Sequence, residues 1–305
     1  MRFNRMRGAL VATLVLVAPL AAYADSPPPE TIYLSLGTSL AAGSQADANG
    51  DTTFSSESSY TDQLYQRVKG RIGANLVHEK LGCDGETTDQ FMGGVNVSGQ
   101  PSKCAGLYDT GSQLGDALAA IGGGNVVLIT IDIGANDVLQ AQQVCQGDPG
   151  CIVGQIPVIA GKVAQIVGTL RQAGYGGPIV AMNYYNPQVA AAIGYFSGVA
   201  GQQAPNPVLA QLSDQLAQGF NGALAQAYAA TGAQVADVYG AFNAGDFGDD
   251  KPPNGIWDNV DVVCDLSYMC PDDPGVKANI HLTRKGYRVV AKTFLGIVAD
   301  IDFAS

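Results

Sequence analysis

The chain has 305 residues, of which 47% are hydrophobic and 14% are charged, and its formal net charge is −11 at pH 7. A chain of this length and composition can bury a substantial core. The acidic balance makes nucleic acid and anionic membrane surfaces poor partners, and we expect neither.

The first residues indicate an export signal. Three arginines within the first seven residues precede an apolar run at positions 9–20, and Ala22-Tyr23-Ala24 offers small residues for cleavage. The run is shorter than the roughly 20 residues of a spanning helix, and no other segment approaches that length, so we expect no stable membrane insertion. We predict that residues 1–24 are removed near Ala24. Residues 25–305 then form one secreted domain, extracellular or periplasmic, which we expect to be monomeric.

Apolar, β-rich runs alternate with helical patterns along the rest of the chain. The run at 126–131 is almost continuously apolar, which is typical of a strand buried on both faces of a parallel sheet. Gly174 and Gly232 stand where helix stops are expected. Strands are predicted at residues 32–36, 75–80, 125–133, 178–183 and 234–238. Helices are predicted at residues 59–68, 112–120, 153–173, 207–231 and 283–301.

This alternation predicts an open, three-layer α/β/α sandwich around a five-stranded, mainly parallel sheet. In such folds the ligand crevice lies beyond the carboxyl ends of the strands. Ser39 follows the first predicted strand, Gly85 the second and Asn136 the third. Residues 43–59 are predicted to form a long mobile loop beside the serine, and residues 188–203 an irregular insertion.

The six cysteines are even in number, which in an exported chain favours three disulfides over a metal site. Six cysteines allow about 15 pairings, but the short spacings favour Cys145–Cys151 and Cys264–Cys270, which leaves Cys83–Cys104. No CxxC or HExxH spacing is present, so we expect no metal, and no cofactor is indicated.

Four short segments together could carry out acyl transfer. Gly37-Thr38-Ser39-Leu40 exposes a serine hydroxyl in the turn after a strand, and His281 supplies an imidazole that can take its proton. Gly85 lets a backbone N–H approach a substrate closely, and Asn136 adds a side-chain amide. Such donors suit the oxyanion that forms when a carbonyl is attacked.

The order and spacing of Gly-x-Ser-Leu, Gly-x-x-Gly-x-Thr-Thr, Gly-Ala-Asn-Asp and a late His-Leu-Thr-x-x-Gly-Tyr resemble blocks I, II, III and V of the GDSL-type SGNH hydrolases. The resemblance runs from about Ile32 to the C-terminal helix. It implies a flavodoxin-like fold, a Ser39 nucleophile, a His281 general base, and an oxyanion hole formed by the Ser39 N–H, Gly85 and Asn136. It also implies metal-independent hydrolysis of esters of lipids, small acyl alcohols or acylated sugars.

Two positions depart from the family pattern. Thr38 replaces the usual Asp before the serine, and its hydroxyl can still bond a neighbouring backbone group. Ala278 replaces the usual Asp three residues before the histidine, yet the imidazole needs an acceptor on its second nitrogen. The backbone carbonyl near Ala278 is our first choice for this acceptor. The alternatives are Asn279 and an acid from Asp272 or Asp273.

Other polar residues are interpreted more simply. Asp84 and Asp137 are read as structural acceptors for loop N–H groups, and His78 as a packed or edge residue of a strand. The apolar segment 190–196 either lines an acyl pocket or forms a small lid, or it packs in the core.

We therefore interpret the chain as a secreted serine ester hydrolase acting on lipid-like or short-chain acyl esters. A carbohydrate acetyl esterase is the alternative substrate class. A catalytically weak secreted binding module of the same fold is the alternative from outside the enzymes.

Overall fold

The computed structural model describes residues 30–54, 58–250 and 253–303, so the predicted export signal lies outside the described residues. Its centre is a sheet of five parallel strands in the order β4-β1-β5-β6-β7. The strands are β1 (Thr31–Gly37), β4 (Leu76–Lys80), β5 (Val126–Asp132), β6 (Ile179–Met182) and β7 (Gln234–Ala236). All five match predicted strands, and the order reverses direction at β1, where ligands bind in sheets of this kind.

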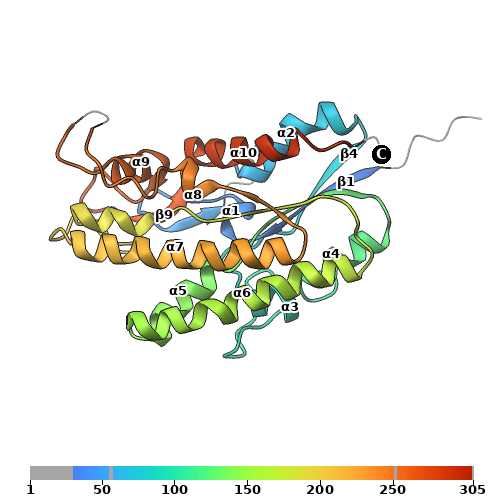
Figure 1. Ribbon diagram of the computed structural model, residues 1–305, viewed down its shortest axis with the longest axis horizontal. Coiled ribbons are helices and arrows are strands. Elements are labelled where there is room, and N and C mark those ends of the chain that lie inside the picture. The colour runs from blue at the N-terminus through green and yellow to red at the C-terminus, as the bar shows by residue number, and fades with distance from the viewer. Residues whose placement is uncertain (1–29, 55–57, 251–252, 304–305) are drawn as a thin grey trace, which may run out of the picture.

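Helices cover both faces of the sheet (Figure 1). One layer contains α2 (Tyr60–Ile72), α8 (Val238–Ala241), α9 (Asp258–Leu266) and α10 (Arg284–Val298). The other contains α3 (Thr88–Gly93), α4 (Gln113–Gly122), α5 (Ala135–Val144), α6 (Pro149–Gln172) and α7 (Pro207–Ala230). The predicted three-layer α/β/α sandwich is confirmed.

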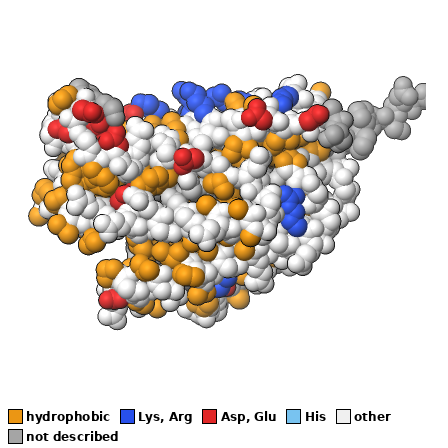
Figure 2. Space-filling view, viewed as in Figure 1, with side chains coloured by type: hydrophobic (Ala, Val, Ile, Leu, Met, Phe, Trp, Pro, Cys, Tyr) orange, Lys and Arg blue, Asp and Glu red, His pale blue; other side chains and the backbone are white. Residues whose placement is uncertain are grey.

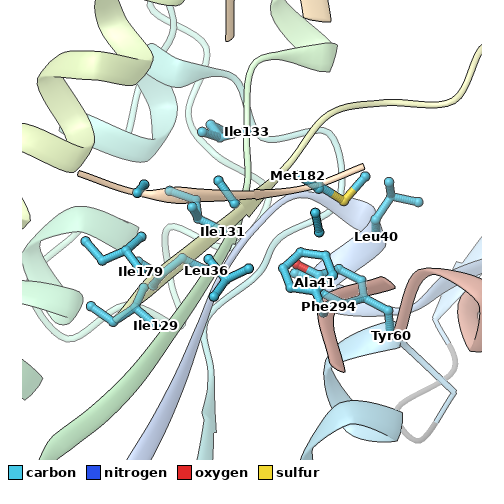
Figure 3. Packing of buried hydrophobic residues seen from close by; sticks show 14 of the residues in the cluster. Leu36, Leu40, Ala41, Tyr60, Ile129, Ile131, Ile133, Ile179, Met182 and Phe294 are labelled. Atoms are coloured by element: carbon cyan, nitrogen blue, oxygen red, sulfur yellow. The ribbon is translucent and has the colours of Figure 1, made fainter. Parts of the chain in front are cut away.

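The core lies between the sheet and each helical layer. Ile129 of β5 pairs with Ile179 of β6, and Figure 3 shows their side chains next to each other. On another part of the sheet Tyr60 of α2 stacks on Phe294 of α10, with ring centroids 4.7 Å apart, beside Ala41 (Figure 3). All of these side chains are almost fully buried. Each large one contributes roughly 1.5–3 kcal/mol by leaving water, and together they fix the strand ends that carry the polar residues described below.

Several short elements were not predicted. They are α1 (Ser39–Ala42), the 3-10 helix η1 (Pro187–Ile193), and two antiparallel pairs, β2 (Ser44–Ala46) with β3 (Thr52–Phe54) and β8 (Ser267–Tyr268) with β9 (Asn279–Leu282). The expectation of a long mobile loop at 43–59 is wrong for the β2–β3 part, because hairpin pairing satisfies its backbone. η1 likewise gives the start of the insertion at 188–203 a regular structure. Within it Ala190 and Ala191 are fully buried, in agreement with the core-packing interpretation.

α6 alone among the described helices is long and apolar enough to cross a membrane by length and composition, which the sequence analysis did not anticipate. Its apolar stripe packs inside the protein against α5 and α7, as expected of a core helix. Lys and Arg side chains gather over α2 and α10, whereas hydrophobic side chains gather over the left ends of α6 and α7 (Figure 2).

The three predicted disulfides are present. Cys83 bonds to Cys104, Cys145 to Cys151, and Cys264 to Cys270, and no described cysteine is free. This use of cysteine fits a secreted protein.

Candidate active site

The turn after β1 presents Ser39. β1 ends at Gly37, whose φ of +134° is a conformation that side chains rarely adopt. A Cβ at this position would lie 2.4 Å from the carbonyl oxygen of Asp132, so only glycine fits. Gln113 fixes the turn further, accepting from the Gly37 N–H at 2.5 Å and donating to its carbonyl at 3.0 Å. Ser39 then begins α1, and its side chain is 8% exposed.

Asp132, the last residue of β5, holds this turn through hydrogen bonds to Thr38. Its Oδ1 accepts from the Thr38 N–H at 2.8 Å and from the Thr38 hydroxyl at 2.5 Å, and its Oδ2 accepts from Tyr60 at 2.9 Å. The Thr38 hydroxyl thus bonds a carboxylate rather than the backbone group that the sequence suggested. Complete burial raises the pKa of Asp132 to about 7, although these hydrogen bonds oppose the rise. Asp132 was not singled out in the sequence, where it is the last residue of an apolar run.

The loop after β4 lies against the same turn. The Leu81 N–H donates to Ser35 and the Cys83 N–H to Gly37, so the chain continues along β1 beyond the end of β4. Gly85 follows with φ +76°, again in the region that favours glycine. Among the described residues, neither the Ser39 N–H nor the Gly85 N–H donates a hydrogen bond to a neighbour. Both donors are therefore available to another acceptor.

Asn136 stands in the first turn of α5, directly after β5. Its Nδ2 donates to the carbonyl of Glu86 at 3.0 Å, which joins the segment after β5 to the loop after β4. An amide nitrogen carries two hydrogens, so one remains for a further acceptor.

One pocket brings the predicted residues together. Ser39, Asn136 and His281 all line it, whereas Gly85 lies outside its lining. Among the described residues no hydrogen bond joins Ser39 to His281, although both side chains line the same pocket. The rest of the lining is largely apolar and includes Leu40, Val138, Leu139, Leu216, Ala217 and Phe220.

Tyr184, Tyr185, Asn186 and Pro187 also line the pocket. This segment was not recognised from the sequence as part of a site. Tyr185 also donates to the Ile280 carbonyl at 2.5 Å, next to His281 in β9.

Asn279 holds the imidazole of His281. Its Oδ1 lies 2.7 Å from His281 Nδ1 and accepts the His281 backbone N–H at 2.9 Å, while its Nδ2 donates to the Gly50 carbonyl at 2.9 Å. These partners fix which end of the amide is oxygen. Nδ1 must then carry the proton and donate, which leaves Nε2 as the acceptor that a general base requires.

The other orienting groups considered for His281 are differently placed. The Ala278 carbonyl accepts the Gly198 N–H at 2.7 Å. The Ala278 side chain packs in an apolar cluster with Val189, Val260 and Met269. Asp272 and Asp273 are exposed. The contact first expected from the Ala278 carbonyl is thus made by Asn279, one of the alternatives.

The β2–β3 hairpin supports this arrangement. Gly50 lies in its turn with φ +81°, and a Cβ there would lie 2.1 Å from the Lys277 carbonyl oxygen. This close approach brings the Gly50 carbonyl to Asn279. The segment that was predicted to be mobile is therefore part of the support for the imidazole.

Burial and two charges act on His281. Burial lowers its pKa to about 4, Asp84 opposes this fall, and Lys103 adds to it. The imidazole is accordingly neutral at pH 7 and able to accept a proton. Asp84 was interpreted from the sequence as an acceptor for loop N–H groups. In the structure its Oδ1 lies 3.7 Å from His281 Nε2, so its carboxylate is next to the imidazole.

Asp137 and His78 behave as predicted. Asp137 accepts from the N–H of Thr88 at 2.9 Å and from its hydroxyl at 2.5 Å. His78 lies in β4, an edge strand, where it stacks on Tyr33 and bonds the Ser35 hydroxyl at 2.9 Å. Among the described residues no group of three or more His, Cys, Asp or Glu side chains could hold a metal ion.

Comparison with protein families identifies the chain. Residues 35–289 match the GDSL-like Lipase/Acylhydrolase family, a range that includes Ser39, Gly85, Asn136 and His281. The chain belongs to this family. Membership makes it an ester hydrolase by class, without deciding between esterase and lipase. No curated protein sequence matches it significantly.

Three solved structures are similar to this GDSL-like chain, and the first of them supports a shared fold. An extracellular lipase from Streptomyces rimosus superposes with a TM-score of 0.52 and 17% identity over 86% of this chain and 99% of that one. A phospholipase A1 from Streptomyces albidoflavus gives 0.48 and 14% over 87% and 99%. Est24, a carbohydrate acetylesterase from Sinorhizobium meliloti, gives 0.47 and 13% over 88% and 99%.

Proposed function

We propose that the chain is an exported carboxylic-ester hydrolase that works through a Ser39 acyl-enzyme with His281 as general base. The observation that carries this proposal is that Ser39 and His281, from opposite ends of the sequence, line one pocket beyond the carboxyl ends of the strands. Asn279 leaves Nε2 free to accept the Ser39 proton. The Ser39 N–H, the Gly85 N–H and the second Asn136 hydrogen would stabilise the oxyanion.

The substrate class that fits the pocket best is an ester with an apolar acyl group. Apart from Ser39, Asn136 and His281, the walls are built largely from aliphatic and aromatic side chains of α5 and α7. α5 contains one charged residue, Asp137, and α7 one, Asp214, and both are buried and hydrogen-bonded. In a chain with a net charge of −11, two helices without an exposed charge beside the pocket favour an uncharged, apolar substrate.

The surroundings of the pocket support the same class. Exposed large hydrophobic side chains occur at the end of α5, the start of α6 and the start of α7, and these are Val144, Val153, Val208, Leu209 and Leu212. Figure 2 shows hydrophobic side chains over these helix ends. A lipid-like ester could contact this surface while its acyl group enters the pocket. Export is supported by the three disulfides and by the arginine-led apolar N-terminus.

A series of p-nitrophenyl esters from acetate to palmitate tests the proposal. We expect kcat/KM to rise from acetate to a longer acyl chain, because each added methylene is buried against apolar walls and strengthens binding. Ser39→Ala should lower turnover of every ester by at least about 10⁴-fold. A maximum at acetate, with release of acetate from acetylated sugars, would instead indicate the carbohydrate esterase. Absence of turnover with all esters, in a folded protein, would indicate the binding module.

A further inference from the structure

Asp84 faces the imidazole of His281 from the side opposite Asn279. Its Oδ1 lies 3.7 Å from His281 Nε2, and its side chain is 10% exposed. The same carboxylate accepts from the Ser44 hydroxyl at 3.4 Å through Oδ1 and from the Lys103 ammonium through Oδ2. Nε2 is the nitrogen that Asn279 leaves unprotonated. A buried negative charge therefore stands next to the atom that would receive the Ser39 proton.

A disulfide fixes this acid and its cation together. Cys83 directly precedes Asp84 and Cys104 directly follows Lys103, and the two cysteines are bonded. The crosslink thus holds Asp84 and Lys103 side by side, although helix α3 lies between them in the sequence. The ammonium also stands close to Gly85, since a Cβ on that glycine would lie 3.4 Å from Lys103 Nζ.

Other charges near β9 are engaged elsewhere or lie outside its immediate surroundings. Lys277 pairs with Asp51 in solvent. Glu86, two residues after Asp84, accepts from Ser102 at 2.5 Å. β2 and α1, which pack against β9, have no titratable side chain. The remaining titratable residues of packed elements are Tyr268 of β8 and Arg284, Lys285, Tyr287, Arg288 and Lys292 of α10. The charges that act on His281 are those of Asp84 and Lys103.

We propose that Asp84, held by Lys103 and the Cys83–Cys104 disulfide, is the carboxylate that stabilises protonated His281 during catalysis. It would take over the charge that the family normally places where this chain has Ala278, but from the Nε2 side. Asn279 would orient the ring, and Asp84 would compensate its charge. Asp84 would thus act through His281 and would not touch the substrate, and this role rests on the proposed function.

The chemical step explains why this charge matters. The Ser39 oxygen forms a bond to the substrate carbonyl carbon while its proton passes to His281 Nε2, and the carbonyl electron pair moves to the oxyanion. When the oxyanion collapses, the bond to the alcohol oxygen breaks and the imidazolium returns the proton to that oxygen. The imidazolium exists between these events, and again when His281 takes a proton from the water that attacks the acyl-enzyme and returns it to Ser39 as the acid leaves. A carboxylate beside Nε2 stabilises the imidazolium, and the positive charge of Lys103 reduces that stabilisation.

The histidine NMR signals test the proposal independently of turnover. The chain has two histidines, so a His78→Asn variant assigns both imidazole signals. Asp84→Asn should lower the pKa of His281, because it removes a negative neighbour. Lys103→Met should raise it, because it removes a positive one. Lys277→Met, which deletes another exposed lysine ammonium, should leave the pKa of His281 unchanged.

Kinetics should follow the same signs. In Asp84→Asn, kcat/KM for p-nitrophenyl butyrate should fall about tenfold at pH 8, the factor that corresponds to one pKa unit. The acid limb of the pH profile of kcat/KM should move to lower pH in Asp84→Asn and to higher pH in Lys103→Met. Both variants break the same ion pair, so a purely structural role would move both acid limbs in one direction.

Opposite shifts of His281 in the two variants, with reduced turnover in Asp84→Asn, would support the proposal. An unchanged His281 titration in Asp84→Asn overturns it. So does a gain of turnover in that variant, which would make Asp84 a competitor of Ser39 for Nε2. If the wild-type protein cleaves no ester, the proposed function fails, and the NMR titrations still decide whether this pair controls the protonation of His281.

Discussion

The side-chain oxygen of Asn279 lies 2.7 Å from Nδ1 of His281, two residues further along the same short strand. Successive side chains of a strand point to opposite faces, so residues two apart share a face. A neutral amide therefore occupies the position beside the imidazole where an acid is expected in this family.

Asn279→Ala should lower kcat by about 10²-fold or more, with little change in KM. The imidazole would lose the acceptor that fixes its tautomer, and a wrong tautomer is costly in serine hydrolases. Steady-state kinetics on a soluble p-nitrophenyl ester provide the measurement. Thr52→Val is the matched control, because Thr52 lies 3.5 Å from the same nitrogen and accepts from Asn279 Nδ2 at 3.3 Å. The shorter bond from that amide to the Gly50 carbonyl remains in this variant, so its kcat should stay close to wild type. Equal losses in both variants would show that the hairpin, and not the amide, orients the ring.

Ala278→Asp should destabilise the protein and not restore a stronger catalytic acid. The side chain at this position is 1% exposed and packs in the apolar cluster of η1 and α9. An unpaired carboxylate there should cost about 3 kcal/mol or more. Denaturant unfolding measures the loss, and Ala278→Ser should lose less. A variant with normal stability and raised turnover would mean that the new carboxylate reaches the imidazole.

Asp132→Asn should change how stability depends on pH. The folded-state pKa of Asp132 is about 7, above its usual value of 3.8, so the folded protein binds a proton that the unfolded chain releases. The contribution of this group therefore favours folding below about pH 4 and is lost as pH rises through 7. The buried histidines, with pKa values lowered to about 4, act with the opposite sign between about pH 4 and 6.5.

The difference between wild type and the variant isolates Asp132. Relative to wild type, Asp132→Asn should be more stable at pH 8 than at pH 5, as measured by the free energy of unfolding in urea at both values. The amide can still accept from Thr38 and donate to Tyr60, so the geometry is retained. A stability difference that does not vary with pH would indicate that Asp132 is ionised throughout this range.

Ala217→Phe should shorten the acyl chain that the enzyme accepts. Ala217 lines the pocket from α7, and a phenyl ring there would fill part of the space. We expect kcat/KM to fall for long-chain p-nitrophenyl esters by about 10-fold or more and to change little for acetate. Ala229→Phe is the control, since Ala229 is exposed on the same helix and outside the pocket lining. Uniform losses along the ester series would argue that acyl groups bind elsewhere.

The central sheet could be predicted because its strands are short, β-rich segments between helical patterns, and β5 is almost continuously apolar. Residues 129–131 pair with neighbouring strands on both sides and residues 128–131 are fully buried, so the run stands out. The disulfides could be predicted for a similar reason, since two of the pairs are close in sequence. Such signals are local, and a single chain displays them directly.

The support of His281 could not be predicted in the same way. β9 has four residues and its partner β8 has two, which is too short for a periodic pattern to appear. Without that strand, nothing indicated that Asn279 and His281 share a face while Ala278 turns away. Gly50 reaches Asn279 from the other end of the chain, and Asp132 is hidden in an apolar run. These contacts depend on tertiary structure.

Labelling with a fluorophosphonate, followed by mass spectrometry of the digested protein, identifies the nucleophile. We expect one modified residue, Ser39, no adduct in Ser39→Ala, and a much slower reaction in His281→Ala, because the serine loses its base. An adduct that persists in Ser39→Ala, or that maps to another serine in the wild-type protein, would contradict this assignment.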